Sequence, residues 1–108
     1  PDYERIVLIV ADMIKNGFLQ QNAFDAIDVY SVPEKQIQIL LLMMEFYNRG
    51  AAVIKAGAPL SKVNSLPVKE EIVRLKTTVP NDKLEMIKET ESRFEEQMGG
   101  LERMYSKV

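Results

Sequence analysis

The stretch PEKQIQILLLMMEFYNRGAAVIKA at residues 33–56 decides the fold of this chain. Apolar residues recur in it at spacings of three and four, which is typical of one face of a helix. They form a main stripe of Ile37, Leu40, Leu41, Met44, Tyr47, Ala51 and Ile54, widened by Ile39, Leu42, Met43 and Phe46. Because the middle of this helix is apolar nearly all round, we predict that it forms the buried centre of a bundle.

Punctuating residues mark both ends of this helix. Ser31 and Glu34 match an S-x-x-E capping box, and Pro33 suits the first turn. Gly57 followed by Pro59 predicts the end of the helix.

A helix before this centre is predicted over residues 2–16. Ile6, Val10 and Met13 share one face with Val7 and Ile14. Leu8 and Ile9 fall off that face, which indicates either a second buried side or a neighbour outside this chain.

Two helices are predicted after the centre. A short helical turn is expected at residues 60–64, and a third helix opens at Pro67 and stops before Pro80. Asn81 or Asp82, with Glu85 three residues after Asp82, predicts the cap of a fourth helix. Its heptad seam consists of Leu84, Ile87, Glu91, Phe94, Met98, Leu101 and Tyr105. We expect a break or kink where Gly99 and Gly100 cross this seam.

The composition indicates a globular all-α domain. With 108 residues, 46% of them hydrophobic, the chain is long enough for one helical domain over residues 1–108, a bundle of about four helices with short loops. A net charge of −2 makes nucleic acid an improbable partner. The longest wholly apolar run, residues 39–44, is far shorter than the ~20 residues of a membrane span, so we expect no direct span.

Little in the sequence could carry catalysis. The absence of Cys and His removes thiolate and imidazole chemistry and the usual zinc sites. The sequence has no phosphate-binding loop. Acidic pairs occur at Glu70–Glu71 and Glu95–Glu96, and we interpret both as solvated surface charge. We expect no catalytic residue and no metal site, and we interpret the six Met residues mainly as core filler.

The segment FLQQNAF at residues 18–24 is the most distinctive local feature. Its amides could satisfy backbone groups in a buried connector. Alternatively, its two phenylalanines and its amides could form a flat recognition surface for a ring.

FLQQNAF, together with EKQ at residues 34–36, resembles a specific family. Further matching stretches are LLLMMEFYNRG at 40–50, KAGAPLSKV at 55–63 and LPVKEEIVRLK at 66–76. This order is similar to the C-terminal helical region of the catalytic A subunit (alpha chain) of archaeal-type and vacuolar-type rotary ATP synthases. Pro33 departs from the family at the start of the helix.

The resemblance implies a parent subunit that makes or hydrolyses ATP, coupled to ion or proton transport. ATP or ADP and magnesium would bind the parent, at an interface with the non-catalytic B subunit. The phosphate loop would lie outside this chain, so the chain alone would be no enzyme and would hold no cofactor. The chain would act as a helical lever toward the central-stalk subunits, in a cytoplasmic, peripheral part of a membrane-associated complex.

The resemblance also implies two groups of site residues. Because the corresponding stretch of F-type catalytic subunits reads FLSQPF, Phe24 would border the adenine ring, and Phe18 would lie near it. The rotor-facing turn of those relatives would fall at or just before residues 1–5, which points to Asp2, Tyr3, Glu4 and Arg5. The alternative is an independent helical protein-interaction module that uses the heptad seam to bind a partner helix.

Overall fold

The computed structural model describes residues 2–16 and 32–105, with side chains from residue 5 onward. Regular structure in these residues is entirely helical. The elements are α1 (Asp2–Ile14), α2 (Pro33–Lys55), α3 (Leu60–Asn64), α4 (Pro67–Thr78), the 3-10 helix η3 (Leu84–Met86) and α5 (Ile87–Met104). The predicted all-α class is confirmed for the part of the chain that the structure describes.

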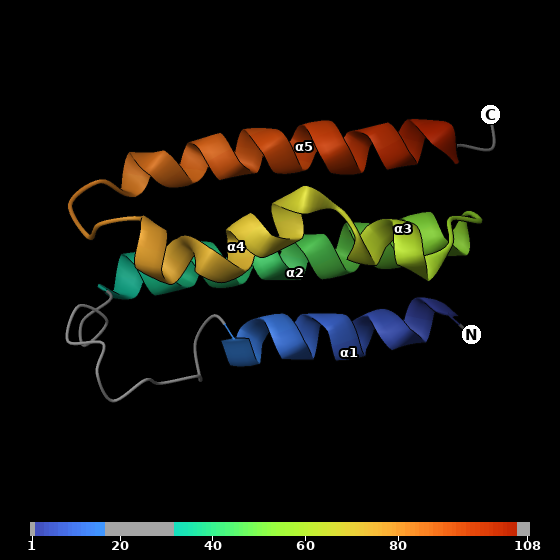
Figure 1. Ribbon diagram of the computed structural model, residues 1–108, viewed down its shortest axis with the longest axis horizontal. Helices are drawn as coiled ribbons and strands as arrows, with labels where there is room; N and C mark the ends of the chain where they lie inside the picture. Colours follow the sequence, from blue (N-terminus) through green and yellow to red (C-terminus); the bar gives the residue numbers. More distant parts are fainter. Residues whose placement is uncertain (1, 17–31, 106–108) are drawn as a thin grey trace.

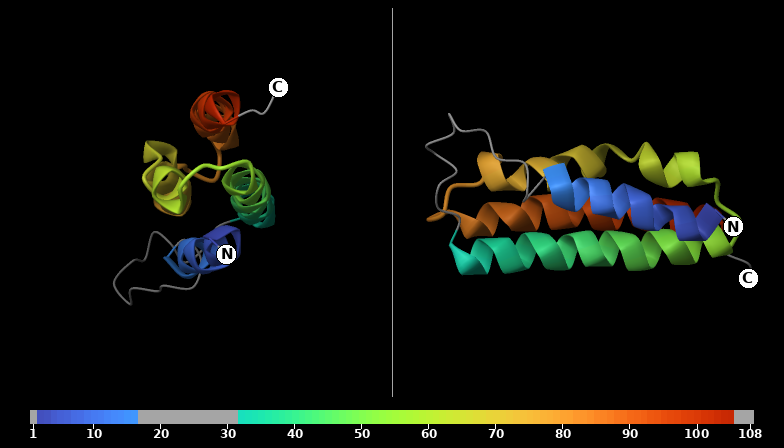
Figure 2. Two further views of the ribbon diagram at one scale, coloured as in Figure 1. Left: turned by 90° about the vertical axis from the view of Figure 1, so that its right-hand side faces the viewer. Right: turned by 90° about the horizontal axis from the view of Figure 1, so that it is seen from below.

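The helices run up and down beside one another (Figure 1). Seen from the end, α1, α2, the α3–α4 pair and α5 form four rods around a shared core (Figure 2). Helix α2 contacts all the other α-helices, whereas α1 packs on α2 and α3, and α4 packs on α2 and α5. The predicted central position of α2 is therefore confirmed.

The buried face of α2 is not the predicted one. Its buried residues are Lys35, Ile39, Leu42, Met43, Phe46, Gly50, Val53 and Ile54. Most of the predicted main stripe lies on the opposite side and is exposed: Ile37, Leu40, Leu41, Met44 and Tyr47. A helix that is apolar on two faces has two possible inward faces by periodicity alone, so only the packing of its neighbours decides between them.

Helix α1 approaches α2 closely at one glycine. Gly50 is buried, and a Cβ there would collide with Cδ1 of Ile6 and lie 3.2 Å from Cγ1 of Val63. Ile6 and Val63 are themselves fully buried. The absence of a side chain at Gly50 thus lets α1 and α3 pack against the same turn of α2.

Prolines set the bounds of α2 and α4. Both helices begin with Pro, and the residue before each, Val32 or Leu66, is extended. Val79, just before Pro80, is also extended and ends α4 as predicted. Gly57 ends α2 with a φ of 122°.

The predictions of capping boxes agree less well with the structure than the predictions from proline. The N-cap residue of α2 is Val32, without a side-chain cap, and Ser31 lies outside the described residues. Neither η3 nor α5 has a side-chain cap at its start. The Oδ1 atom of Asn81 instead accepts a hydrogen bond from the backbone N–H of Val32, at 3.3 Å. The prediction of a local cap at Asn81 or Asp82 was therefore wrong.

Helix α5 is continuous through Gly99 and Gly100, so the expected break is absent. The seam holds the helix on both sides of the glycines, because Phe94, Met98 and Leu101 are all buried. The predicted seam position of Glu91 was wrong: Glu91 is exposed, and Thr90 beside it takes the inward position.

Replacement by alanine should have opposite effects at Gly99, inside a helix, and at Gly57, where φ is positive. Gly99→Ala should raise the free energy of unfolding by about 0.5–1 kcal/mol, because alanine stabilises a helix interior. The nearest atom to the added Cβ would be Nη1 of Arg103, at an ordinary 3.4 Å. Gly57→Ala should lower the free energy of unfolding by about 1–2 kcal/mol, because φ is positive at this position. Urea denaturation of both variants checks the signs; a stabilised Gly57→Ala variant would contradict the backbone argument.

Helix α2 is unusually apolar for a helix that has an exposed face. It is the one helix in the described ranges that is long and apolar enough to cross a membrane by length and composition. Core helices of soluble bundles pass the same test, but only 39% of its most apolar window is buried in this bundle. Much of the apolar surface of α2 is therefore left without a partner in the described structure.

Candidate functional site

Few of the predicted site residues belong to the described part of the chain. Phe18, Phe24 and the rest of FLQQNAF lie outside the described residues. The backbone of residues 2–4 forms the first turn of α1, their side chains are not described, and Arg5 is exposed. This turn lies at the end of the bundle that also holds α3 (Figure 1).

The described residues offer binding surfaces rather than a reactive centre. Among them, no group of three or more acidic side chains could hold a metal ion. The two acidic pairs remain on the surface, but one carboxylate of each joins two helices. Glu71 of α4 pairs with Arg93 of α5 at 2.6 Å, and Glu95 of α5 pairs with Arg49 of α2 at 2.5 Å.

Arg49 is the centre of a polar cluster between α2 and α5. It donates two hydrogen bonds to Glu102, from Nε at 3.0 Å and from Nη2 at 2.5 Å. Its guanidinium carbon also lies 5.3 Å from the centroid of the Phe94 ring, within the range of a cation–π contact. The hydrogen bonds between Arg49 and Glu102 lower the pKa of the carboxyl group and raise the pKa of the guanidinium. The cluster fixes the distance between α2 and α5 and so shapes the groove between them.

Helix α4 is capped at both ends by other helices. At its start, Oε1 of Gln97 in α5 accepts a hydrogen bond from the backbone N–H of Val68, at 2.9 Å. At its end, Nζ of Lys35 in α2 donates to the carbonyl oxygen of Lys76, at 2.5 Å. Lys35 is only 3% exposed, and a cation at a helix C-terminus also meets a favourable dipole. Sequence reasoning missed both caps, because partners 29 and 41 residues away leave no local motif.

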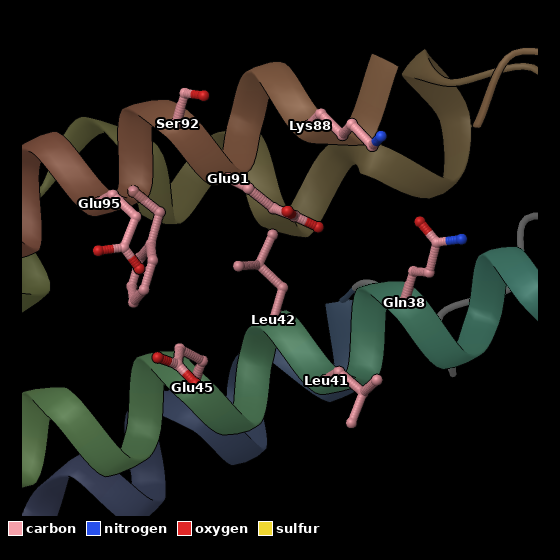
Figure 3. A pocket seen from close by; sticks show the side chains of 9 residues that line it. Gln38, Leu41, Leu42, Glu45, Lys88, Glu91, Ser92 and Glu95 are labelled. Atoms are coloured by element: carbon pink, nitrogen blue, oxygen red, sulfur yellow. The ribbon is translucent and has the colours of Figure 1, made fainter. Parts of the chain in front are cut away.

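A groove of about 680 Å³ runs between α2 and α5 (Figure 3). Its lining consists of Gln38, Leu41, Leu42, Glu45, Lys88, Glu91, Ser92, Phe94 and Glu95. The carboxylate of Glu91 points down into the gap toward Leu42, and Glu45 lies on α2, across the gap from Glu95 (Figure 3). Together with the adjoining Arg49 cluster, the groove holds four carboxylates against two cations, and this net negative charge disfavours nucleotide phosphates and favours cations.

An exposed apolar face of α2 borders this groove. It consists of Ile37, Leu40, Leu41, Met44 and Tyr47, and Leu41 also lines the groove. Leu8 on α1 is another large apolar residue left in solvent, at 71% exposure. A contiguous exposed apolar patch on a single chain marks an interaction surface. A neighbour outside this chain, one of the two alternatives predicted from Leu8 and Ile9, would therefore have a surface to cover.

These features define the class of protein: an antiparallel four-rod helical domain whose described surfaces suit docking to other helices. Comparison with known proteins gives the family. The C-terminal domain of V and A type ATP synthase matches residues 1–64, which cover α1, α2 and α3. The chain belongs to this family, and the resemblance found in its sequence is confirmed.

Relatives of the chain carry names that agree with this family. The A subunit of the A-type ATP synthase of Pyrococcus abyssi is 40% identical over 97 residues, which are 89% of this chain and 10% of the relative. The V-type ATP synthase alpha chain of Halothermothrix orenii is 40% identical over 96 residues, 89% of this chain and 16% of that protein. The corresponding A-type protein of Thermococcus onnurineus is 40% identical, over 89% of this chain and 17% of its own length. The chain thus spans a small part of these relatives.

Proposed function

We propose that this chain serves as the C-terminal domain of a catalytic subunit that makes or hydrolyses ATP, coupled to ion transport. The family match over residues 1–64 is the observation that carries this proposal. The 40% identity to the A-type and V-type relatives supports it over most of the chain. The parent would work with a non-catalytic B subunit and central-stalk subunits, in the cytoplasmic, peripheral part of a membrane-associated complex.

In this proposal the domain transmits movement rather than performing chemistry. Its interhelical caps and the Arg49 cluster tie α2, α4 and α5 together, and a stiff bundle suits a lever acting on a rotor stalk. ATP or ADP and magnesium would bind elsewhere in the parent, so the chain alone should not hydrolyse ATP. The rotor-facing end would be the first turn of α1, with Asp2, Tyr3, Glu4 and Arg5.

The adenine-bordering role is assigned to Phe24, with Phe18 near the same ring. A phosphate site and magnesium would hold the charged end of the nucleotide, while an aromatic face would contribute ~0.5–1.5 kcal/mol of stacking beyond the area that it buries. The two contributions are separable, because one acts on the base and the other on the phosphates.

Replacing Phe24 tests this role in the full-length protein within its assembled complex. Phe24→Ala should weaken nucleotide binding by about 1–3 kcal/mol, roughly ten- to a hundredfold in affinity. Phe24→Trp should have a milder effect, because stacking needs only a flat face. Nucleotide titration and single-turnover measurements separate binding from chemistry. Unchanged affinity in a correctly assembled Phe24→Ala complex would remove Phe24 from the adenine site.

A further inference from the structure

The α2–α5 groove holds a carboxylate that the bundle does not use. Glu91 lies next to the buried seam residue Thr90, but it is exposed and points into the groove above Leu42. The other carboxylates of the groove, Glu45 and Glu95, both lie within 4 Å of Arg49. Among the ion pairs of the described residues, none includes Glu91. Glu91 is therefore available to a cation from outside the chain.

The surface beside Glu91 is apolar and long in one direction. Leu41 lines the groove and is 58% exposed. One helical turn away on the same side lie Ile37 and Met44, which are also exposed. This row follows the axis of α2, and α5 runs alongside it (Figure 2). A helix of a partner fits such a surface, because its side chains also repeat every three to four residues.

We propose that the α2–α5 groove docks an amphipathic helix of a partner protein. Its apolar side chains would lie on Leu41 and Leu42, and a Lys or Arg on its flank would pair with Glu91. A basic flank is favoured because the groove and the adjoining Arg49 cluster hold four carboxylates (Glu45, Glu91, Glu95 and Glu102) against two cations (Lys88 and Arg49).

A second copy of this chain is a poorer occupant. In a two-fold symmetric dimer the same surface patch meets itself. Such an interface would bring three carboxylates and one lysine of one copy against the same set of the other, and an excess of like charge across an interface suppresses association. The charge of the groove thus argues for a basic helix and against self-association.

Peptide binding to the 108-residue chain tests the proposal. The probe is a capped synthetic helix of about 18 residues, long enough to be helical, with leucines at i, i+3, i+4 and i+7 and lysines along one flank. A matched peptide carries glutamate in place of every lysine. We expect the lysine peptide to bind at least about tenfold more tightly than the glutamate peptide, by fluorescence anisotropy.

Substitutions at Glu91 locate the binding site. Glu91→Gln should weaken binding of the lysine peptide about fivefold, and Glu91→Lys should reverse the preference toward the glutamate peptide. Glu89→Gln is the matched control, because Glu89 is also exposed on α5 but lines a different groove, against α4. It should change affinity less than about twofold.

Three outcomes would overturn the proposal. The first is equal binding of the two peptides to the natural chain. The second is an equal response to Glu91→Gln and Glu89→Gln, with circular dichroism showing both variants folded. The third is a dimer in analytical ultracentrifugation that Leu41→Gln dissociates, which would make a second copy the occupant.

Discussion

Replacing Phe46 with alanine is expected to lower the free energy of unfolding by about 3–5 kcal/mol, the largest effect of any substitution proposed for this chain. Phe46 lies on the buried face of α2 and is 0% exposed. Its ring centroid lies 6.3 Å from that of Phe94 in α5, with the ring planes at 41°. Truncation would remove this aromatic contact and leave a cavity at the centre of the bundle.

Leu41→Ala is the matched control for Phe46→Ala. Leu41 is on the same helix, five residues earlier, but it is 58% exposed on the outer face. Its truncation should cost less than about 1 kcal/mol in the isolated chain. Chemical denaturation of both variants at one pH gives the comparison. A larger loss for Leu41→Ala than for Phe46→Ala would mean that α2 packs through its other face.

Arg49→Met should be the second most damaging change, at about 2–4 kcal/mol. Methionine keeps part of the apolar stem but loses the two hydrogen bonds to Glu102 and the contact with the Phe94 ring. The exposed pair with Glu95 adds little to this figure, because solvent screens it. Thermal and urea unfolding measure the loss.

The same variant should change how stability depends on pH. The pKa of Glu102 is lowered by the hydrogen bonds from Arg49. The contribution of ionised Glu102 to the free energy of unfolding is therefore present above the unfolded pKa of glutamate, about 4.3. It is lost as the pH falls through the lower pKa of the folded state. Arg49→Met should flatten this acid-side loss, whereas Glu45→Gln, whose oxygen lies 3.6 Å from Arg49, should leave it in place. Identical acid profiles for Arg49→Met and the natural chain would contradict the assigned cause.

The helices were predictable because local residues define them. Pro33 and Pro67 start their helices, and Pro80 and Gly57 stop them, through backbone restrictions that need no tertiary contact. Most of the heptad seam of α5 was also predictable, since Ile87, Phe94, Met98 and Leu101 define one inward face; Thr90 takes the position that was predicted for Glu91. Family resemblance added the function class, which no residue in the described bundle could indicate alone.

The inward face of α2 was not predictable in the same way. Both of its sides are apolar, so the choice depends on where α1, α4 and α5 pack, and that information is spread over the chain. The predictions of helix caps were wrong for a related reason. Motif rules look three residues ahead, whereas Gln97 and Lys35 reach α4 from other helices. Of the predicted site residues, only Arg5 has a described side chain, and the adenine-bordering role of Phe24 remains a proposal.

The capping of α4 by neighbouring helices has a consequence for how the bundle unfolds. A helix of 12 residues is too short to persist by itself in water, and its exposed end groups would ordinarily fray first. Here one terminal N–H and one terminal carbonyl are held by side chains rooted in α5 and α2. Fraying at either end of α4 therefore breaks a bond to a neighbour. We therefore expect helices α2, α4 and α5 to open as one cooperative unit.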